Sequence, residues 1–103
     1  MAEYHLTNKA VEDLTGIWEY TVDVWSEQQA DSYYYMLIDA CRKITENPRL
    51  LGLKYEEIAE GLHGYRVNRH IIFYRILADG DILVIRILHQ RMDLRSCLNF
   101  IRK

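Results

Sequence analysis

The sequence predicts an α+β fold: a short N-terminal strand, an antiparallel helical hairpin, a three-stranded antiparallel meander and a short C-terminal helix. Two periodicities indicate this class. Apolar residues recur every three or four positions across residues 10–44, as in amphipathic helices, and then alternate or run together in strand-like segments across residues 65–88. The chain of 103 residues is long enough for one core and too short for two. We therefore expect a single domain spanning residues 1–103.

The first helix is predicted to follow a brief strand. The opening AEYHLT alternates, which places Tyr4 and Leu6 on one face of a strand. Thr7 then has the side chain of an N-cap, and the helical period of apolar residues runs from Ala10 to Trp25. The sequence therefore predicts one amphipathic helix directly after the strand.

A second helix is predicted to return along the first. Ser26 and Gln29 have the S-x-x-Q form of a capping box, and apolar residues repeat at helical spacing over residues 30–44. Asn47-Pro48 stops the pattern, because proline lacks the backbone N–H that a helix interior needs. With only a tight turn near Ser26, the two helices are expected to lie antiparallel.

Three strands are expected after residues 49–62, which we interpret mostly as a connection. Tyr65 and Val67 alternate with Arg66 and Asn68, which predicts that Asn68 lies on the polar face of a strand. IIFYRIL and DILVIRIL then form two further strands, separated by a turn at Asp79-Gly80. A final helix capped by Asp93 is expected to present an apolar face made of Leu94, Cys97, Leu98 and Ile101.

Neither face of the predicted sheet is fully polar, since apolar residues occupy both alternating sets of positions in the last two strands. One helical hairpin can cover only one face. We therefore expect a hydrophobic groove that another chain could fill.

Charge is distributed unevenly along the chain. Residues 1–61 carry 5 Lys/Arg against 12 Asp/Glu, a net charge of −7, whereas residues 62–103 carry 8 against 3, a net charge of +5. Such polarity favours one acidic and one basic surface, with partners of opposite character. The alternative is that the two patches mix in space once the chain folds.

Composition and spacing exclude several function classes. No apolar run approaches the roughly 20 residues of a membrane span, and the N-terminus lacks a signal region, so a cytoplasmic protein without membrane contact is expected. Cys41 and Cys97 are far apart, and the four histidines fall on different predicted elements, so no metal or other cofactor is expected. Phosphate-binding loops and hydrolase elbows are also missing from the sequence.

What remains is a group of arginines and histidines around the strand ends. Such residues can hold RNA phosphates, with His89 as a proton carrier, which is the minimum for a metal-independent ribonuclease. They can equally pair with acidic residues of a protein partner.

Three stretches resemble a known family. LTNKAVEDLTGIWEYT, GYRVNRHIIFYRI and DILVIRILHQRMD are similar to the ParE branch of the RelE/ParE toxins of bacterial type II toxin–antitoxin systems. The resemblance spans nearly the whole chain and implies the same strand, hairpin and sheet. It also implies a small toxin that poisons DNA gyrase, blocks replication and is neutralised by a ParD-like antitoxin. Binding to operator DNA is then expected only through the antitoxin, not by the chain alone.

The same resemblance bears on catalysis. RelE-type members cut messenger RNA on the ribosome with Arg, Lys and Tyr side chains. This chain has Ile71 at the position of one RelE-type arginine and Cys97 near that of the catalytic tyrosine, while Arg91 matches a second arginine. Loss of a phosphate-binding group and a base would each cost orders of magnitude in rate. We therefore expect a non-enzymatic toxin; the alternatives are a RelE-like ribosome-dependent endoribonuclease and an inactive member that binds only its antitoxin.

Two surfaces are predicted from the resemblance and the charge pattern. An antitoxin segment is expected to lay apolar side chains in the groove between sheet and hairpin, with acidic residues reaching the arginines. The expected antitoxin-binding residues are Arg66, Arg69, Arg86, Tyr74 and Trp18. The expected toxicity surface is His89, Arg91 and Arg95. Deletion after Asp93 is expected to relieve toxicity while sparing much of the sheet, unless the last helix covers the core, in which case it would unfold the protein.

Overall fold

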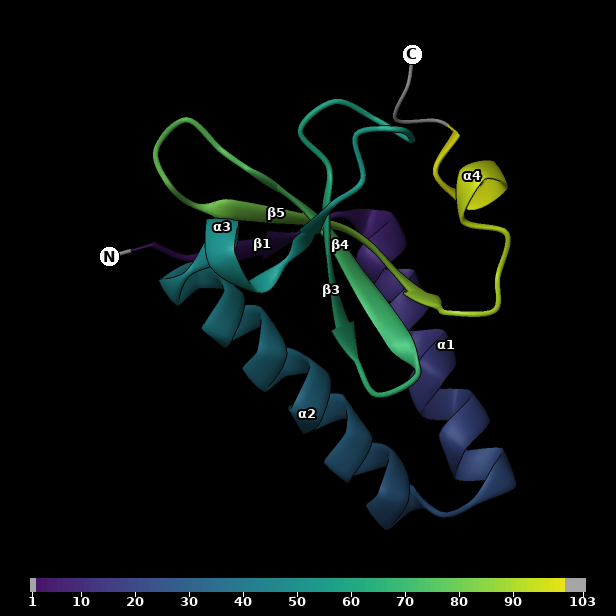
Figure 1. The fold of residues 1–103 in the computed structure, drawn as a ribbon. Coiled ribbons are helices and arrows are strands. Elements are labelled where there is room, and N and C mark those ends of the chain that lie inside the picture. Colours follow the sequence, from purple (N-terminus) through teal and green to yellow (C-terminus); the bar gives the residue numbers. More distant parts are fainter. Residues whose placement is uncertain (1, 100–103) are drawn as a thin grey trace.

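The computed structural model describes residues 2–99 and has the predicted α+β architecture, with the helical hairpin packed along the sheet (Figure 1). The sheet has five strands in the order β1-β5-β4-β3-β2; β1 runs parallel to β5 and the other neighbours are antiparallel. The elements are β1 (Tyr4–Leu6), α1 (Asn8–Val24), α2 (Glu27–Glu46), α3 (Pro48–Leu51), β2 (Leu53–Lys54), β3 (His63–Val67), β4 (His70–Ile76), β5 (Ile82–His89) and α4 (Leu94–Cys97).

The predicted helix boundaries are confirmed. The Thr7 hydroxyl accepts a hydrogen bond of 3.1 Å from the Ala10 N–H, and the Ser26 hydroxyl accepts one of 3.0 Å from the Gln29 N–H. These are the donors that a helix start leaves unsatisfied. The second helix ends at Glu46, just before the Asn47-Pro48 pair. Among residues 2–99, no helix is long and apolar enough to span a bilayer.

The sheet differs from the prediction at two places. Asn68 is not a strand residue: Val67 pairs with His70, so Asn68-Arg69 is a two-residue hairpin turn. Asn68 has a φ of 56°, a value that asparagine tolerates better than most residues. The segment over residues 49–62 also contributes α3 and the edge strand β2, which the weak local pattern had not indicated.

Two apolar cores lie on the two faces of the sheet. The first joins the hairpin to the sheet and includes Leu37, Ile44, Ile72 and Tyr74, all with exposed fractions of 0%. The second fills the opposite face and consists of Ile58, Ala59, Leu62, Ile71, Phe73, Ile85, Leu88 and Leu98. The expectation that this face stays open for another chain is wrong, because the segment over residues 55–62 and the start of the C-terminal region cover it.

We predict that the C-terminal region stabilises the fold through Leu98, which is fully buried in the second core. Leu98→Ala should lower the free energy of unfolding by about 2–4 kcal/mol, the usual cost of a buried Leu→Ala cavity. Leu50→Ala is the matched control, since Leu50 is 83% exposed, and it should change stability by less than about 0.5 kcal/mol. Urea denaturation measures both; equal losses would contradict the assignment. Truncation after Asp93 removes Leu98 and is expected to destabilise the chain.

Candidate functional site

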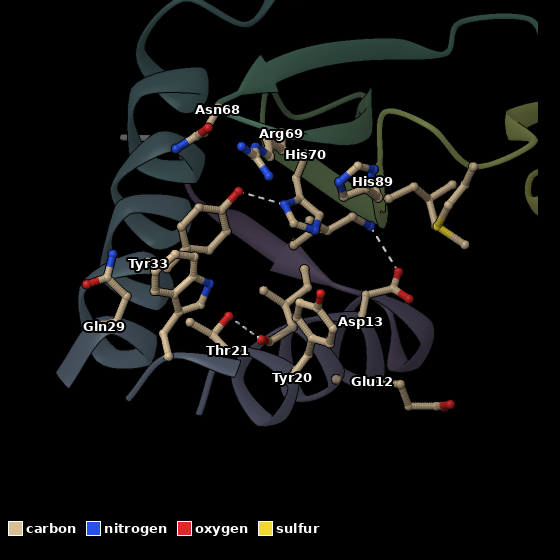
Figure 2. A pocket seen from close by; sticks show the side chains of 16 residues that line it. Glu12, Asp13, Tyr20, Thr21, Gln29, Tyr33, Asn68, Arg69, His70 and His89 are labelled. Carbon is tan, nitrogen blue, oxygen red and sulfur yellow. Dashed lines mark hydrogen bonds between the residues drawn. The ribbon is translucent and has the colours of Figure 1, made fainter. Parts of the chain in front are cut away.

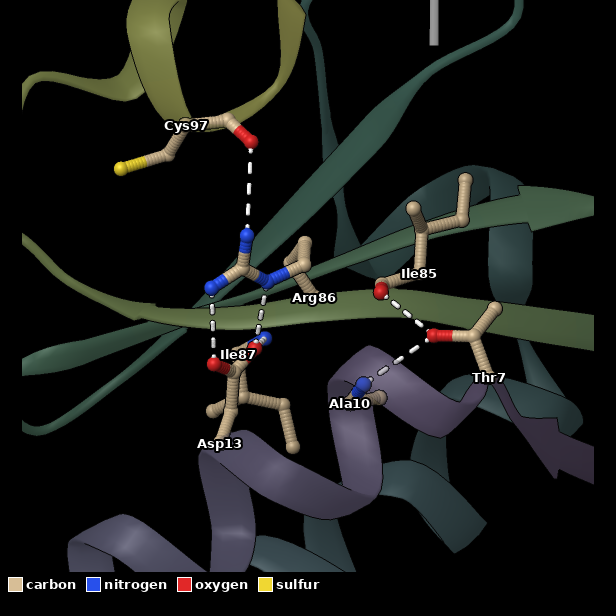
Figure 3. Close-up of polar contacts among 7 residues, drawn as sticks. All are labelled: Thr7, Ala10, Asp13, Ile85, Arg86, Ile87 and Cys97. Atoms are coloured by element: carbon tan, nitrogen blue, oxygen red, sulfur yellow. Dashed lines mark hydrogen bonds and ion pairs between the residues drawn. The ribbon is translucent and has the colours of Figure 1, made fainter. Parts of the chain in front are cut away.

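An ion pair between α1 and β5 anchors the hairpin to the sheet (Figure 3). Arg86 donates from Nε to Asp13 Oδ2 over 2.7 Å and from Nη2 to Asp13 Oδ1 over 2.8 Å. The Ile87 N–H adds a third hydrogen bond to Asp13 Oδ2, at 2.9 Å. Arg86 Nη1 also donates to the Cys97 carbonyl at 3.4 Å. One guanidinium therefore connects the first helix, the last strand and the C-terminal helix.

The pair is mostly shielded from water, with side-chain exposures of 17% for Arg86 and 14% for Asp13. The hydrogen bond to Asp13 raises the pKa of Arg86 above its ordinary value, so the guanidinium stays charged. Arg86 was expected to receive an acidic group of the antitoxin. Its acidic partner in the structure is instead Asp13 of the same chain.

A pocket of about 640 Å³ opens beside this ion pair, between the helical hairpin, the β3–β4 turn and the end of β5 (Figure 2). We call it the hairpin–sheet pocket. It is lined by Glu12, Asp13, Gly16, Ile17, Tyr20, Thr21, Trp25, Gln29, Tyr33, Asn68, Arg69, His70, Ile87, Leu88, His89 and Met92. Asp13 belongs both to the ion pair and to the wall, so the ion pair holds one side of the pocket in place.

Tyr33, His70 and His89 form a polar cluster within the pocket (Figure 2). The Tyr33 hydroxyl and His70 Nδ1 share a hydrogen bond of 2.6 Å, and the rings of His70 and His89 meet edge to face at 5.2 Å between centroids. Burial lowers the pKa of His70 to about 4, helped by the neighbouring His89. Burial also raises the pKa of Tyr33. Both groups are therefore neutral at pH 7 and offer hydrogen bonds rather than charge.

Large apolar side chains at the pocket are unusually exposed. Trp25 is 73% exposed, Tyr20 67% and Met92 44%. Arg69, an exposed residue on the β3–β4 turn, adds positive charge to the same rim. Aromatic residues, methionine and arginine are the types enriched in the buried centres of protein–protein interfaces.

A second hollow, which we call the outer groove, lies between α2 and β3 and has a volume of about 870 Å³. Tyr35, Met36, Lys43, Tyr65 and Arg66 are among its lining residues. Arg66 is exposed and donates from Nε to the Asn68 carbonyl at 3.2 Å. The two arginines expected at one antitoxin surface therefore lie at different hollows, Arg66 at the outer groove and Arg69 at the hairpin–sheet pocket.

Tyr74 and Trp18 have structural partners within the chain. Tyr74 is fully buried and its hydroxyl donates to the Pro48 carbonyl, so it supports the first core instead of presenting a surface. Trp18 donates from Nε1 to Asp31 Oδ1 at 2.9 Å, which links the two helices of the hairpin. Trp18 does not line the hairpin–sheet pocket.

The three residues expected to form the toxicity surface lie on successive segments. His89 ends β5 and lines the hairpin–sheet pocket. Arg91 is exposed in the following turn, and its N–H donates to His89 Nδ1 at 3.1 Å. Arg95 is exposed on α4 and donates from Nη1 to the Glu57 carbonyl at 3.4 Å. Their role in toxicity stays a prediction.

Sequence reasoning missed most of the pocket. Gly16 and Ile17 lie three and four residues after Asp13, and Tyr20 lies four and three residues after them. The four residues therefore share a face of α1, a signal that was available in the helical period. Tyr33 and His70 meet only because α2 packs beside the β3–β4 turn, and the sequence carries no local signal for that contact.

We predict that Asp13→Ala destabilises the chain more than the removal of an exposed carboxylate does. The substitution leaves Arg86 shielded without its partner, which typically costs about 3 kcal/mol or more in the free energy of unfolding. Asp23→Ala, at an exposed position on the same helix, is the control and should stay within about 0.5 kcal/mol of the parent. Denaturant titration followed by circular dichroism distinguishes the two. A loss for Asp13→Ala no larger than for Asp23→Ala would contradict the role of the ion pair.

Comparisons with known proteins agree with this architecture. Residues 4–94 match the family model of the ParE toxin of the type II toxin–antitoxin system parDE. Toxin ParE1 of Mycobacterium tuberculosis is 38% identical over 92 residues, covering 89% of this chain and 93% of the relative. Toxin ParE1 of Caulobacter vibrioides is 34% identical over 98 residues, covering 95% and 99%. A solved chain of the chromosomal ParDE system from P. aeruginosa superposes with a TM-score of 0.74 at 16% identity, covering 86% of this chain and 96% of that one, which shows a shared fold. The chain thus belongs to the ParE toxin family of type II toxin–antitoxin systems.

Proposed function

We propose that this chain inhibits DNA gyrase by protein–protein contact, blocks replication in the cytoplasm, and is neutralised by a ParD-like antitoxin. The observation that carries the proposal is membership of the ParE toxin family across residues 4–94. The gyrase target and the ParD-like partner come from the family resemblance. The structure supports a binding protein, since the hairpin–sheet pocket is rimmed by exposed aromatic side chains.

The antitoxin segment is proposed to occupy the hairpin–sheet pocket. Its apolar side chains would cover Tyr20, Trp25 and Met92, which are exposed in the free chain. An acidic residue of the segment would pair with Arg69 at the rim. Arg86 and Tyr74 are left out of this contact because both have partners inside the chain.

The chemistry of the site supports a non-enzymatic role. A general base works best with a pKa near the working pH, whereas burial holds the pKa of His70 at about 4. Arg86 is engaged by Asp13, and Ile71 is buried in the second core at the position of a RelE-type arginine. Arg69 and Arg91 are the arginines left near His89, whose Nδ1 already accepts the Arg91 N–H. The chain alone is proposed not to bind DNA, with operator binding left to the antitoxin.

The purified toxin should inhibit DNA supercoiling by gyrase while leaving messenger RNA intact in a ribosome-dependent cleavage assay. Cleavage of the RNA with unaffected gyrase would instead establish the RelE-like alternative. If expression of the chain causes no growth arrest and neither assay responds, the chain is an inactive member that only binds its antitoxin. Either outcome, RNA cleavage with unaffected gyrase or no response in both assays, would contradict the proposal.

Charge reversal at the pocket rim tests where the antitoxin binds. Arg69→Glu should raise the Kd of the complex with the ParD-like antitoxin by at least about tenfold and slow association, because it replaces an attractive rim charge by a repulsive one. Arg49→Glu is the matched control: Arg49 is exposed on α3, at the other end of α2, and the change in net charge is identical (Figure 1). Surface plasmon resonance gives both rates. Equal effects of the two reversals would reject the proposed position.

A further inference from the structure

Three potential metal ligands meet at the N-terminal edge of the sheet, away from both hollows. Glu3 and His5 come from the N-terminal segment, and Asp81 directly precedes β5. One ligand atom from each lies within 4.8 Å of the other two. None of the three lines the hairpin–sheet pocket or the outer groove.

Backbone contacts hold the Asp81 carboxylate and the Glu3 backbone in position. Asp81 Oδ1 accepts the Glu3 N–H at 2.9 Å, and the Ile82 N–H donates to the Glu3 carbonyl at 3.0 Å. Asp79 Oδ1 accepts the Asp81 N–H at 3.0 Å, which fixes the turn before β5. With Oδ1 occupied in this way, Asp81 Oδ2 faces His5 Nε2 at 2.9 Å. The site is therefore built by the pairing of β1 with β5 and by the β4–β5 turn.

We propose that Glu3, His5 and Asp81 bind a divalent first-row transition metal ion, for which zinc is the representative probe. His5 Nε2, a carboxylate oxygen of Asp81 and a carboxylate oxygen of Glu3 are the protein ligands, and water completes the coordination. The donor set selects this class of ion: imidazole nitrogen suits zinc and its neighbours, whereas magnesium and calcium take oxygen ligands.

The geometry fits a shared ion. Two ligands at about 2.1 Å from a metal lie about 3.0 Å apart when they subtend a right angle, and about 3.4 Å apart in a tetrahedron. The Nε2–Oδ2 distance of 2.9 Å is close to the first value and needs only a small side-chain rotation for the second. The ion takes the place of the hydrogen that now joins His5 to Asp81. Asp79, on the same turn, adds negative charge that favours a cation over an anion.

Binding would fasten the first strand to the last. His5 and Asp81 are 76 positions apart in the sequence, so an ion held by both ties the N-terminal segment to β5. Because the unfolded chain does not hold these ligands together, the ion stabilises the folded state by mass action. The sequence expectation of no metal rested on local ligand spacing, which is blind to ligands brought together by strand pairing.

Titration of the full chain, without a histidine tag, with ZnCl₂ tests the site. Isothermal titration calorimetry should show one zinc per chain, and the Tm should rise by roughly 10–20 °C at a zinc concentration about a hundred times the Kd. His5→Gln and Glu3→Gln should each weaken binding by tenfold or more. Glu3→Gln keeps the His5–Asp81 hydrogen bond, so it provides a test that does not disturb the strand pairing.

His89→Gln is the matched control, because His89 lies against the imidazole of His70 in the hairpin–sheet pocket, away from the proposed site. It should leave zinc affinity unchanged. Retention of full affinity by both His5→Gln and Glu3→Gln would overturn the proposal, as would loss of affinity in His89→Gln or the absence of binding by the parent chain. The calorimetric result does not depend on toxicity or on the antitoxin, so it stands apart from the proposed function.

Discussion

The ion pair between Asp13 and Arg86 is the interaction on which the arrangement of this fold depends. β5 pairs with both β1 and β4, and α1 is fixed to it by two charge-assisted hydrogen bonds and a third from the Ile87 backbone. Such a contact sets orientation as well as energy, because a planar guanidinium and a carboxylate meet well in few geometries. It thereby sets how the hairpin lies across the sheet, and the pocket between them takes its shape from that angle.

The same constraint divides the basic residues by role. Arg86 is paired with Asp13 within the chain, while Arg69 is exposed on a turn at the rim of the hairpin–sheet pocket. Burial holds the pKa of His70, which lines this pocket, at about 4. A site built in this way can recognise a partner by shape, apolar contact and rim charge.

Much of the fold was predictable from sequence because its signals are local. Helix starts at Thr7 and Ser26 and the glycine turn before β5 depend on groups within three residues of each other. The contacts that build the site are not local. Asp13 and Arg86 are 73 positions apart, and the polar character of arginine on an alternating strand predicts exposure unless the partner is known. For the same reason, the spacing of residues in the sequence could not predict that β1 pairs with β5, or that this pairing brings Glu3, His5 and Asp81 together.

Hydrogen–deuterium exchange of the chain alone and bound to its antitoxin tests most directly whether the hairpin–sheet pocket is the recognition surface. The outer groove between α2 and β3 serves as the internal reference, since it lies in the same molecule and carries its own arginine. Binding in the pocket should slow exchange in the peptides that contain residues 16–20 and 68–70 while leaving those of the outer groove unchanged. Protection confined to the outer groove would contradict this assignment.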